Sequence, residues 1–188
     1  IFNQIEKLLK DNDEPMFIHT TTMQNHQPYN QGKDPDDELG NYLDGVSDMT
    51  KDFREFINYL KTIDEPTVVM MVGDHYPSFK GEDNIYNQLE INGETCSVLY
   101  EQPYLIWTND KKEIDSSVIP NEKISTFYLP YVLMDSIGLK EDSFVQTMLT
   151  KMKEVPVYST HYNSEIPNDE ELDILTYDRV LGENISDD

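Results

Sequence analysis

The central feature of the sequence is the stretch Asp64-Glu65-Pro66-Thr67-Val68-Val69-Met70-Met71-Val72-Gly73-Asp74-His75-Tyr76-Pro77. Its apolar part, residues 67–72, is nearly uninterrupted, which is typical of a β-strand that is covered on both faces. Pro66 stands at the entrance of this strand, where a missing backbone donor does least harm. A carboxylate and an imidazole, Asp74 and His75, follow directly. The sequence therefore predicts a strand that leads into a chemically active loop.

Asp74 and His75 are candidate ligands of a metal ion. Adjacent side chains on a regular strand point to opposite faces, so both can reach one cation only if the chain leaves the pleat. We expect Gly73 to permit that bend. A carboxylate oxygen and an imidazole nitrogen suit a divalent ion such as manganese, zinc or magnesium. Two ligands are too few for a complete shell, and ordinary turn chemistry after a glycine is the alternative interpretation.

An earlier segment repeats this layout. Asp13-Glu14-Pro15 precedes a β-favouring run at Met16–Thr22, which leaves through a loop that carries His26. Between the two runs, apolar residues recur every three or four positions over 41–62, which predicts a long helix. Strand, helix and strand form a βαβ unit, and its right-handed crossover makes the two strands parallel if they share a sheet. Because the carboxyl ends of parallel strands meet at one sheet edge, we expect His26 to lie near Asp74 and His75.

Further periodic segments complete an α/β pattern. The spacing predicts a short amphipathic helix over 1–12, a strand over 103–108, and helices over 125–138 and 143–154. The tail, residues 155–188, is acidic and rich in tyrosine. We expect it to contain a final strand or hairpin that packs through Leu172, Leu175 and Tyr177.

Composition restricts the class of protein. The chain has 188 residues, with 37 acidic against 14 basic side chains, and a formal net charge of −23. A surface this acidic repels phosphate backbones, which argues against nucleic acid as a partner. The apolar run is far shorter than the ~20 residues that a transmembrane helix needs. The single Cys96 can form no internal disulfide. The chain opens with Ile1-Phe2-Asn3, and we expect it to be a fragment whose natural start lies upstream.

Other polar residues have structural interpretations. A loop histidine such as His26 commonly hydrogen-bonds to backbone. Asp44, Asp48 and Asp52 form a stripe on the long helix, where like charges need solvent between them, so we expect a solvated face. We expect three further residues outside any site: His19 as a structural residue of its strand, His161 on the surface and Trp107 in the core. The sequence contains no Gly-x-Ser-x-Gly elbow and no phosphate-binding Gly-x-x-x-x-Gly-Lys loop.

Five blocks carry a family resemblance: Thr22–Tyr29, Val69–Ser78, Gln102–Asn109, Ser125–Leu139 and Tyr177–Gly182. In this order they resemble the C-terminal half of the extracellular catalytic domain of lipoteichoic acid synthase-like proteins, in the sulfatase and alkaline phosphatase superfamily. The blocks extend, with gaps, over most of the chain. One departure concerns the residues after Tyr76, where the well-known polymer synthases carry glycine and this chain has Pro77-Ser78. That departure places it among the broader synthase-like relatives.

The resemblance implies a fold and a site. The fold is an α/β/α sandwich around a mixed, largely parallel sheet. Residues 1–188 form its C-terminal part, with a sheet-and-helix core over 1–154 and an acidic closing tail over 155–188. A divalent ion is implied, manganese in the synthases, with zinc, magnesium or calcium as alternatives. Asp74 and His75 match two of its protein ligands, and His26 matches the histidine that contacts the substrate phosphate.

The implied activity is phosphoglycerol transfer from a phosphatidylglycerol-type headgroup to a growing lipoteichoic acid-like polymer. In the family, a threonine nucleophile, a glutamate ligand and another histidine lie in the N-terminal half. We therefore expect this chain alone to be inactive and to require the rest of the catalytic domain. The parent protein is expected at a bacterial cell membrane, held by an N-terminal anchor, with its catalytic domain on the extracellular face.

Two alternatives stay open at this point. The same fold could hydrolyse a sulfate ester or a phosphodiester, so that the substrate is any phosphorylated or sulfated small molecule or lipid headgroup. The chain could also be a non-catalytic interaction module whose acidic surface docks a basic partner.

Overall fold

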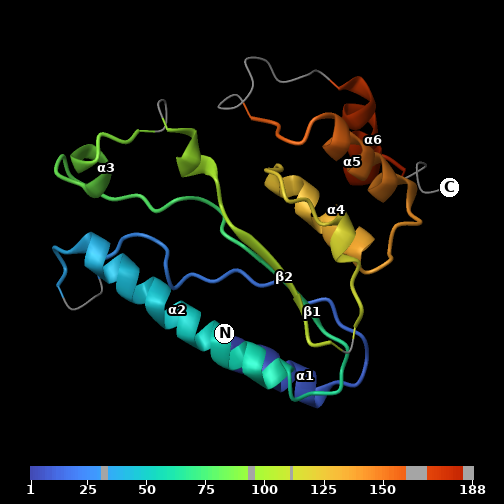
Figure 1. The fold of residues 1–188 in the computed structure, drawn as a ribbon, viewed down its shortest axis with the longest axis horizontal. Helices are drawn as coiled ribbons and strands as arrows, with labels where there is room; N and C mark the ends of the chain where they lie inside the picture. The colour runs from blue at the N-terminus through green and yellow to red at the C-terminus, as the bar shows by residue number, and fades with distance from the viewer. Residues whose placement is uncertain (31–33, 93–95, 111, 160–168, 184–188) are drawn as a thin grey trace. The chain divides into compact units, whose positions relative to one another are not determined.

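The computed structural model of the chain describes residues 1–30, 34–92, 96–110, 112–159 and 169–183. Figure 1 shows the order of the elements along the chain. The chain forms two compact units that alternate in sequence. The first unit comprises Ile1–Thr67, Gly73–Gln102 and Asn109–Lys111, and the second comprises Val68–Val72, Pro103–Thr108 and Lys112–Asp188.

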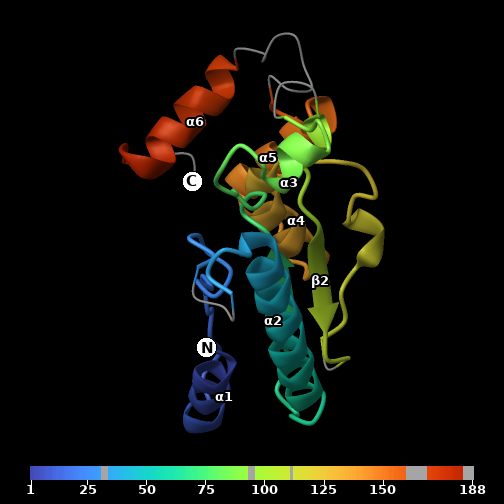
Figure 2. The ribbon, with the colours of Figure 1, turned by 90° about the vertical axis from the view of Figure 1, so that its left-hand side faces the viewer.

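The first unit is built on two helices, α1 (Phe2–Asp11) and α2 (Glu38–Leu60). The Phe2 ring stacks on Phe56 with centroids 5.0 Å apart and contacts Phe53 at 5.7 Å. These ring contacts place α1 beside the C-terminal half of α2 (Figure 2). The unit also contains the short helix α3 (Ile85–Gln88) and the 3₁₀ helix η1 (Ser97–Tyr100).

Both helices predicted in this unit are confirmed. The long helix begins at Glu38, three residues before the predicted start, because the Asp37 side chain accepts a hydrogen bond from the backbone N–H of Gly40 at 2.8 Å. The predicted solvated face is also confirmed, since Asp44, Asp48 and Asp52 are all exposed.

A buried asparagine connects segments of the first unit by hydrogen bonds. Asn109 is 5% exposed. Its amide Nδ2 donates to the carbonyls of Leu60 at 3.2 Å and Glu65 at 2.8 Å. Its Oδ1 accepts from the backbone N–H of Thr67 at 3.1 Å. One side chain thus satisfies three backbone groups at the end of α2 and in the connection that follows it, groups that would be costly to leave unpaired.

The second unit contains a two-stranded antiparallel sheet. β1 (Val68–Val72) pairs with β2 (Tyr104–Thr108), with Val68 opposite Thr108 and Val72 opposite Tyr104. The strands predicted over 67–72 and 103–108 are therefore confirmed. Trp107, expected in the core, is half-buried on β2.

The predicted parallel βαβ unit is wrong for this structure. Met16–Thr22 is extended but forms no strand, and β1 pairs with β2 instead. Composition favours a strand there, yet a strand also needs a neighbour to accept and donate its ladder bonds. His19 was expected to be a structural residue of this strand. That prediction is also wrong, because the segment forms no strand and His19 is exposed. The described residues thus combine helices with a small antiparallel sheet, and they do not show the α/β/α sandwich.

The core of the second unit lies between helices. Here the 3₁₀ helices η2 (Ser116–Val118) and η3 (Thr126–Tyr128) accompany α4 (Leu129–Ser136), α5 (Ser143–Glu154) and α6 (Glu170–Val180). The Tyr128 hydroxyl donates to the carbonyl of Val155 at 3.1 Å, and burial raises the pKa of Tyr128 to about 12. The buried core residues are Tyr128, Val132, Phe144, Met148 and Met152.

The helices predicted over 125–138 and 143–154 are confirmed as η3 with α4 and as α5. Gly138 follows α4 with φ 83°, a left-handed conformation that glycine adopts without strain and that ends the helix as expected. The predicted final strand or hairpin is wrong, because the segment forms the helix α6, whose Leu172 and Leu175 pack against the core. Asp169 caps this helix by accepting from the backbone N–H of Leu172 at 3.0 Å.

Two remaining features bear on the predictions. His161 lies outside the described residues. Among the helices of the described ranges, none combines the length and the apolar character needed to cross a bilayer.

The Asn109 hydrogen bonds predict a large effect of truncation. Asn109→Ala removes its three side-chain bonds. We expect the free energy of unfolding to fall by about 3 kcal/mol, because buried backbone groups lose their partners. Urea denaturation measures this change. The control Asn58→Ala, at an exposed position of α2, should change the stability by less than about 0.5 kcal/mol. Equal effects of the two substitutions would contradict the assigned role.

The pair Asp142 and Arg179 predicts a pH-dependent contribution to stability. Arg179 Nη2 lies 2.8 Å from Asp142 Oδ2, and hydrogen bonds from Arg179 hold the pKa of Asp142 below its ordinary value of 3.8. A depressed folded-state pKa stabilises the fold at neutral pH, and this stability is lost as the pH falls through that pKa. We expect Asp142→Asn, which can still cap α5, to cost about 1 kcal/mol at pH 7. The difference in the free energy of unfolding between Asp142→Asn and the wild type should become smaller as the pH falls below about 4.

Thermal unfolding of both proteins across this pH range measures the effect. Asp48→Asn, at an exposed position of α2, is the control and should show no such narrowing. A difference that stays constant down to low pH would show that the ion pair does not stabilise the fold.

Candidate metal and phosphate site

Asp74 and His75 lie in the loop that follows β1. Asp74 Oδ1 accepts from the backbone N–H of His75 at 2.9 Å, and Asp74 Oδ2 lies 3.5 Å from His75 Nε2. The side chains of Asp74 and His75 are 83% and 52% exposed. Donors that share a transition metal at about 2.1 Å lie roughly 3 to 3.5 Å apart. The two side chains therefore fit two places of one coordination shell.

Both candidate histidines have the same backbone hydrogen bond. His75 Nδ1 lies 2.7 Å from the carbonyl of Tyr76, and His26 Nδ1 lies 2.6 Å from the carbonyl of Gln27. A carbonyl only accepts, so each Nδ1 must carry the proton. In the tautomer with this single proton, the lone pair of each ring lies on Nε2. Metal-binding histidines typically have this arrangement, because the Nδ1 hydrogen bond orients the ring and defines the tautomer.

Tyr29 connects the loop of His26 to the loop of Asp74. Its ring is only 7% exposed and lies 5.5 Å from Phe79, centroid to centroid. Burial raises the pKa of Tyr29, a hydrogen bond with the Ser78 backbone lowers it, and the nearby Asp74 carboxylate raises it. The expected proximity of the two loops is therefore supported at Tyr29. That His26 itself shares a pocket with Asp74 and His75 stays a prediction.

The His26 loop is also held against α2. Asn25 Oδ1 is buried and has no hydrogen-bond partner among the described residues. It packs where a side chain would start on Gly45, since a Cβ there would lie 2.5 Å from this oxygen. Four residues after Asn25, the carbonyl of Tyr29 accepts a hydrogen bond from Asn41 Nδ2 at 2.8 Å. Both ends of the loop are thus attached to α2, on either side of His26.

A chain of aromatic rings continues from Tyr29 through the first unit. Centroid distances between successive rings are 5.2 to 5.9 Å, within the range of edge-to-face and tilted packing. The Tyr86 hydroxyl donates to the carbonyl of Pro77 at 2.7 Å, which attaches α3 to the Asp74 loop. The rings are those of Tyr29, Tyr42, Phe79, Tyr86, Tyr76 and Tyr100.

Sequence reasoning missed this aromatic packing. Tyr29 and Tyr76 lie within the quoted motif blocks, but nothing in their spacing shows that they contact other rings. The available signal is the high count of 12 tyrosines and 7 phenylalanines, together with the position of Tyr76 directly after His75 and of Tyr29 three residues after His26.

Gly73 makes room for a neighbouring side chain. A Cβ at position 73 would lie 2.8 Å from Oε1 of Gln102, so the missing side chain permits this close approach. Among the described glycines, only Gly81 and Gly138 have positive φ, so Gly73 does not use a left-handed conformation. Its expected role in bending the loop stays a prediction.

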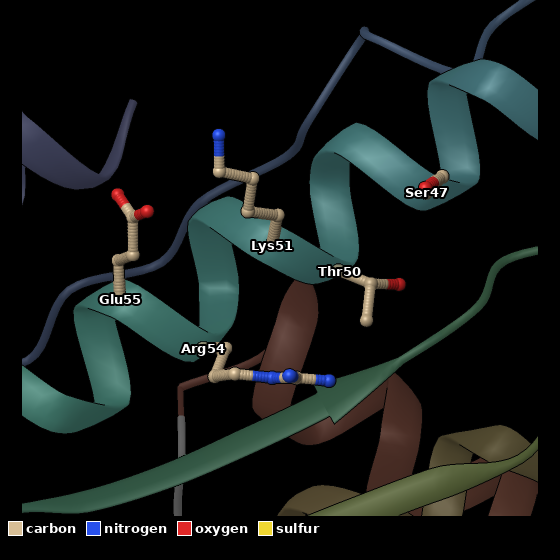
Figure 3. Close-up of a pocket in the computed structure, with 5 residues that line it drawn as sticks. All are labelled: Ser47, Thr50, Lys51, Arg54 and Glu55. Atoms are coloured by element: carbon tan, nitrogen blue, oxygen red, sulfur yellow. The ribbon is translucent and has the colours of Figure 1, made fainter.

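Asp74 and His75 have no third protein ligand in the structure. Across the described ranges, no group of three or more His, Cys, Asp or Glu side chains could hold a metal ion. A hollow of about 380 Å³ lies on α2, and none of the candidate residues lines it. Figure 3 shows that its two cationic side chains, Lys51 and Arg54, point in different directions. Among the described residues, Asp74 and His75 are therefore a pair of candidate ligands, and their role as metal ligands stays a prediction.

Comparison with known proteins identifies the family. The model of the family described as Sulfatase matches residues 1–139, which include His26, Asp74 and His75. No curated protein and no solved structure matches the chain. The family match covers well over half of the 188 residues. The chain therefore belongs to the Sulfatase family, a group of enzymes that process sulfate and phosphate esters and usually use a divalent metal ion.

Proposed function

We propose that this chain supplies one side of a metal-dependent ester-processing centre, with Asp74 and His75 as metal ligands and His26 as a contact for the substrate phosphate. The observation that carries the proposal is the separation of 3.5 Å between Asp74 Oδ2 and His75 Nε2, two exposed donors in a Sulfatase-family chain. The Nδ1 hydrogen bond of His75 supports it, because it leaves Nε2 as the free donor atom.

Each residue has a distinct role in this proposal. Asp74 Oδ2 and His75 Nε2 hold the divalent ion, which would neutralise charge on the ester and activate a nucleophile when bound. His26 Nε2 contacts the phosphate or sulfate group, donating to it when the ring carries a second proton. Tyr29 keeps the two loops together by its contacts with Phe79 and with the Ser78 backbone. We assign no nucleophile within the chain.

We further propose that the reaction is phosphoglycerol transfer from a phosphatidylglycerol-type headgroup, with manganese as the metal ion. Support comes from the resemblance of five sequence blocks to lipoteichoic acid synthase-like proteins, within the family that the chain belongs to. The open ligand pair agrees with an enzyme in which further ligands come from another part of the catalytic domain. We place that domain on the extracellular face of a cell membrane.

Hydrolysis of a sulfate ester or a phosphodiester is the second candidate. It is favoured by Pro77-Ser78, which stand where the polymer synthases carry glycine, since this difference lies two residues from the ligand His75. The same metal ligands serve both reactions. The difference lies in whether the acceptor is a polymer hydroxyl or water.

Manganese binding by the chain tests the ligand pair directly. We expect weak, saturable binding of Mn²⁺, because two ligands provide only part of a coordination shell. Asp74→Asn and His75→Ala should each weaken it by at least about tenfold. Electron paramagnetic resonance of free Mn²⁺ measures the binding. Asp48→Asn, which removes one exposed carboxylate from α2, is the matched control and should bind like the wild type. Unchanged binding in the Asp74 and His75 variants would overturn the assignment, as would nanomolar affinity in the wild type.

Turnover by the intact parent enzyme tests the reaction. Asp74→Ala in that protein should abolish metal-dependent turnover, while Asp48→Ala should leave it unchanged. Parallel assays with a phosphatidylglycerol-type lipid, a simple phosphodiester and a sulfate ester distinguish transfer from hydrolysis. With the lipid, release of diacylglycerol together with incorporation of the glycerophosphoryl group into an acceptor supports transfer, whereas release of free glycerol phosphate indicates hydrolysis. Retained turnover in Asp74→Ala would discard the site.

A further inference from the structure

Glu38, in the first turn of α2, contacts the loop that carries Asp74 and His75. Its Oε2 accepts a hydrogen bond from the backbone N–H of Lys80 at 2.7 Å, although the two residues are 42 positions apart in sequence. A carboxylate that accepts from a backbone N–H forms a charge-assisted bond, which is shorter and stronger than a neutral one. The half-buried Glu38 side chain thus attaches this loop to the helix.

Asn41, three residues further along α2, contacts the loop that carries His26. Its Nδ2 donates to the carbonyl of Tyr29 at 2.8 Å and to the carbonyl of Asp34 at 2.7 Å. Residues three apart lie on the same side of a helix, so Asn41 and Glu38 are neighbours on α2. One face of the N-terminal end of α2 therefore holds two loops that are far apart in sequence.

Three aromatic rings join the same segments. They belong to Tyr29, to Tyr42 on α2 and to Phe79, the residue before Lys80. All three pairs are in contact, with centroids 5.2, 5.5 and 5.8 Å apart. Ring pairs pack favourably at centroid distances from about 4.5 to 7 Å, whereas a hydrogen bond needs its heavy atoms within about 3.2 Å. The rings therefore bring the segments together, and the polar contacts limit how far the segments can slide.

We propose that Glu38 and Asn41 are positioning residues that keep the His26 loop and the loop of Asp74 and His75 at one fixed separation. This inference rests on the proposed function, in which the phosphate or sulfate group of the ester lies between His26 and the metal ion. A tetrahedral anion can contact both only at that separation, and a misplacement of about 1 Å can cost about a hundredfold in rate. Both positioning residues act through the loops, and neither contacts the substrate.

Stability of α2 alone does not account for Glu38. A carboxylate in the first turn of a helix is favourable because of the helix dipole, whichever loop lies nearby. The cap of α2 is already provided by Asp37, which accepts from the backbone N–H of Gly40 at 2.8 Å. Glu38→Gln removes the charge but keeps an acceptor for the Lys80 N–H, whereas Glu38→Ala removes both. The two substitutions therefore separate the bond to the loop from the effect on the helix.

Distances between spin labels in the full chain test the proposal without a metal ion. Nitroxide labels are attached at His26→Cys and Asp74→Cys in a Cys96→Ser background, and electron paramagnetic resonance gives the distribution of distances between them. Both labelled positions are exposed. We expect Glu38→Ala to widen this distribution at least about twofold, because a site without its supporting contacts becomes loose. Asn41→Ala is a second, independent variant and should widen it as well.

The conservative variant and a matched control make this test specific. Glu38→Gln should retain the narrow distribution, and so should Glu55→Ala, which removes an exposed carboxylate from another turn of α2. Circular dichroism confirms that each variant is folded. An unchanged distribution in both alanine variants, Glu38→Ala and Asn41→Ala, would overturn the proposal. Equal widening in Glu38→Gln and Glu38→Ala would also overturn it, since the acceptor for Lys80 would then have no effect.

Turnover by the intact parent enzyme measures the functional consequence. Glu38→Ala should lower kcat/KM by about tenfold to a hundredfold. The affinity for Mn²⁺ should stay unchanged, because Asp74 and His75 lie on one loop and keep their mutual geometry. Glu38→Gln should restore most of the lost rate. A loss of rate that is matched by an equal loss of Mn²⁺ affinity would contradict a positioning role.

The outcome is separable from that of the proposed function. Manganese binding depends on Asp74 and His75, whereas the label distances depend on Glu38 and Asn41 and need no metal ion. A distribution that widens in Glu38→Ala, in a chain that does not bind Mn²⁺, supports the positioning of the loops and overturns the metal site. Manganese binding with a distribution that both alanine variants leave unchanged has the reverse meaning.

Discussion

The candidate site depends on the burial of one side chain, Tyr29. The loops of His26 and Asp74 are separated by the whole of α2 in sequence, and each is largely exposed. Tyr29 is 7% exposed because Phe79 and Tyr42 surround its ring, and its hydroxyl bonds with the Ser78 backbone. Rings of this size bury large areas and pack with specific geometry, so they define the spacing of the segments that carry them. His26, Asp74 and His75 are exposed in the two loops that this aromatic packing connects.

The second constraint is the need of every strand for a hydrogen-bonding neighbour. β1 pairs with β2, whereas Met16–Thr22 has no hydrogen-bonding neighbour among the described residues. A two-stranded sheet is only marginally stable without further strands or helices against it. Asp74 and His75, the proposed metal ligands, likewise have no third candidate ligand among the described residues.

Several elements could be predicted from local pattern alone. The helices α1, α2 and α5 followed from apolar spacing, because an amphipathic helix satisfies its own backbone and needs only one apolar stripe. The tail helix α6 was mistaken for a strand or hairpin, although Asp169 is a recognisable cap for it. For the candidate site, the sequence indicated the residue types and their positions after predicted strands. It did not indicate that the rings of Tyr42, Phe79 and Tyr86 pack beside the two loops. Contacts between residues so distant in sequence leave no periodic signal.

The sequence by itself determined the helices α1, α2, α4 and α5, the positions of the strands β1 and β2, and the identity of the candidate ligands Asp74, His75 and His26. These properties depend on local spacing, on side-chain chemistry and on the order of motifs along the chain. Only the tertiary structure decided that β1 pairs antiparallel with β2, that Met16–Thr22 stays unpaired, and that Gly73 makes room for Gln102. The physical reason is that strand pairing and close packing depend on which distant groups are present to meet, and a one-dimensional pattern does not contain that information.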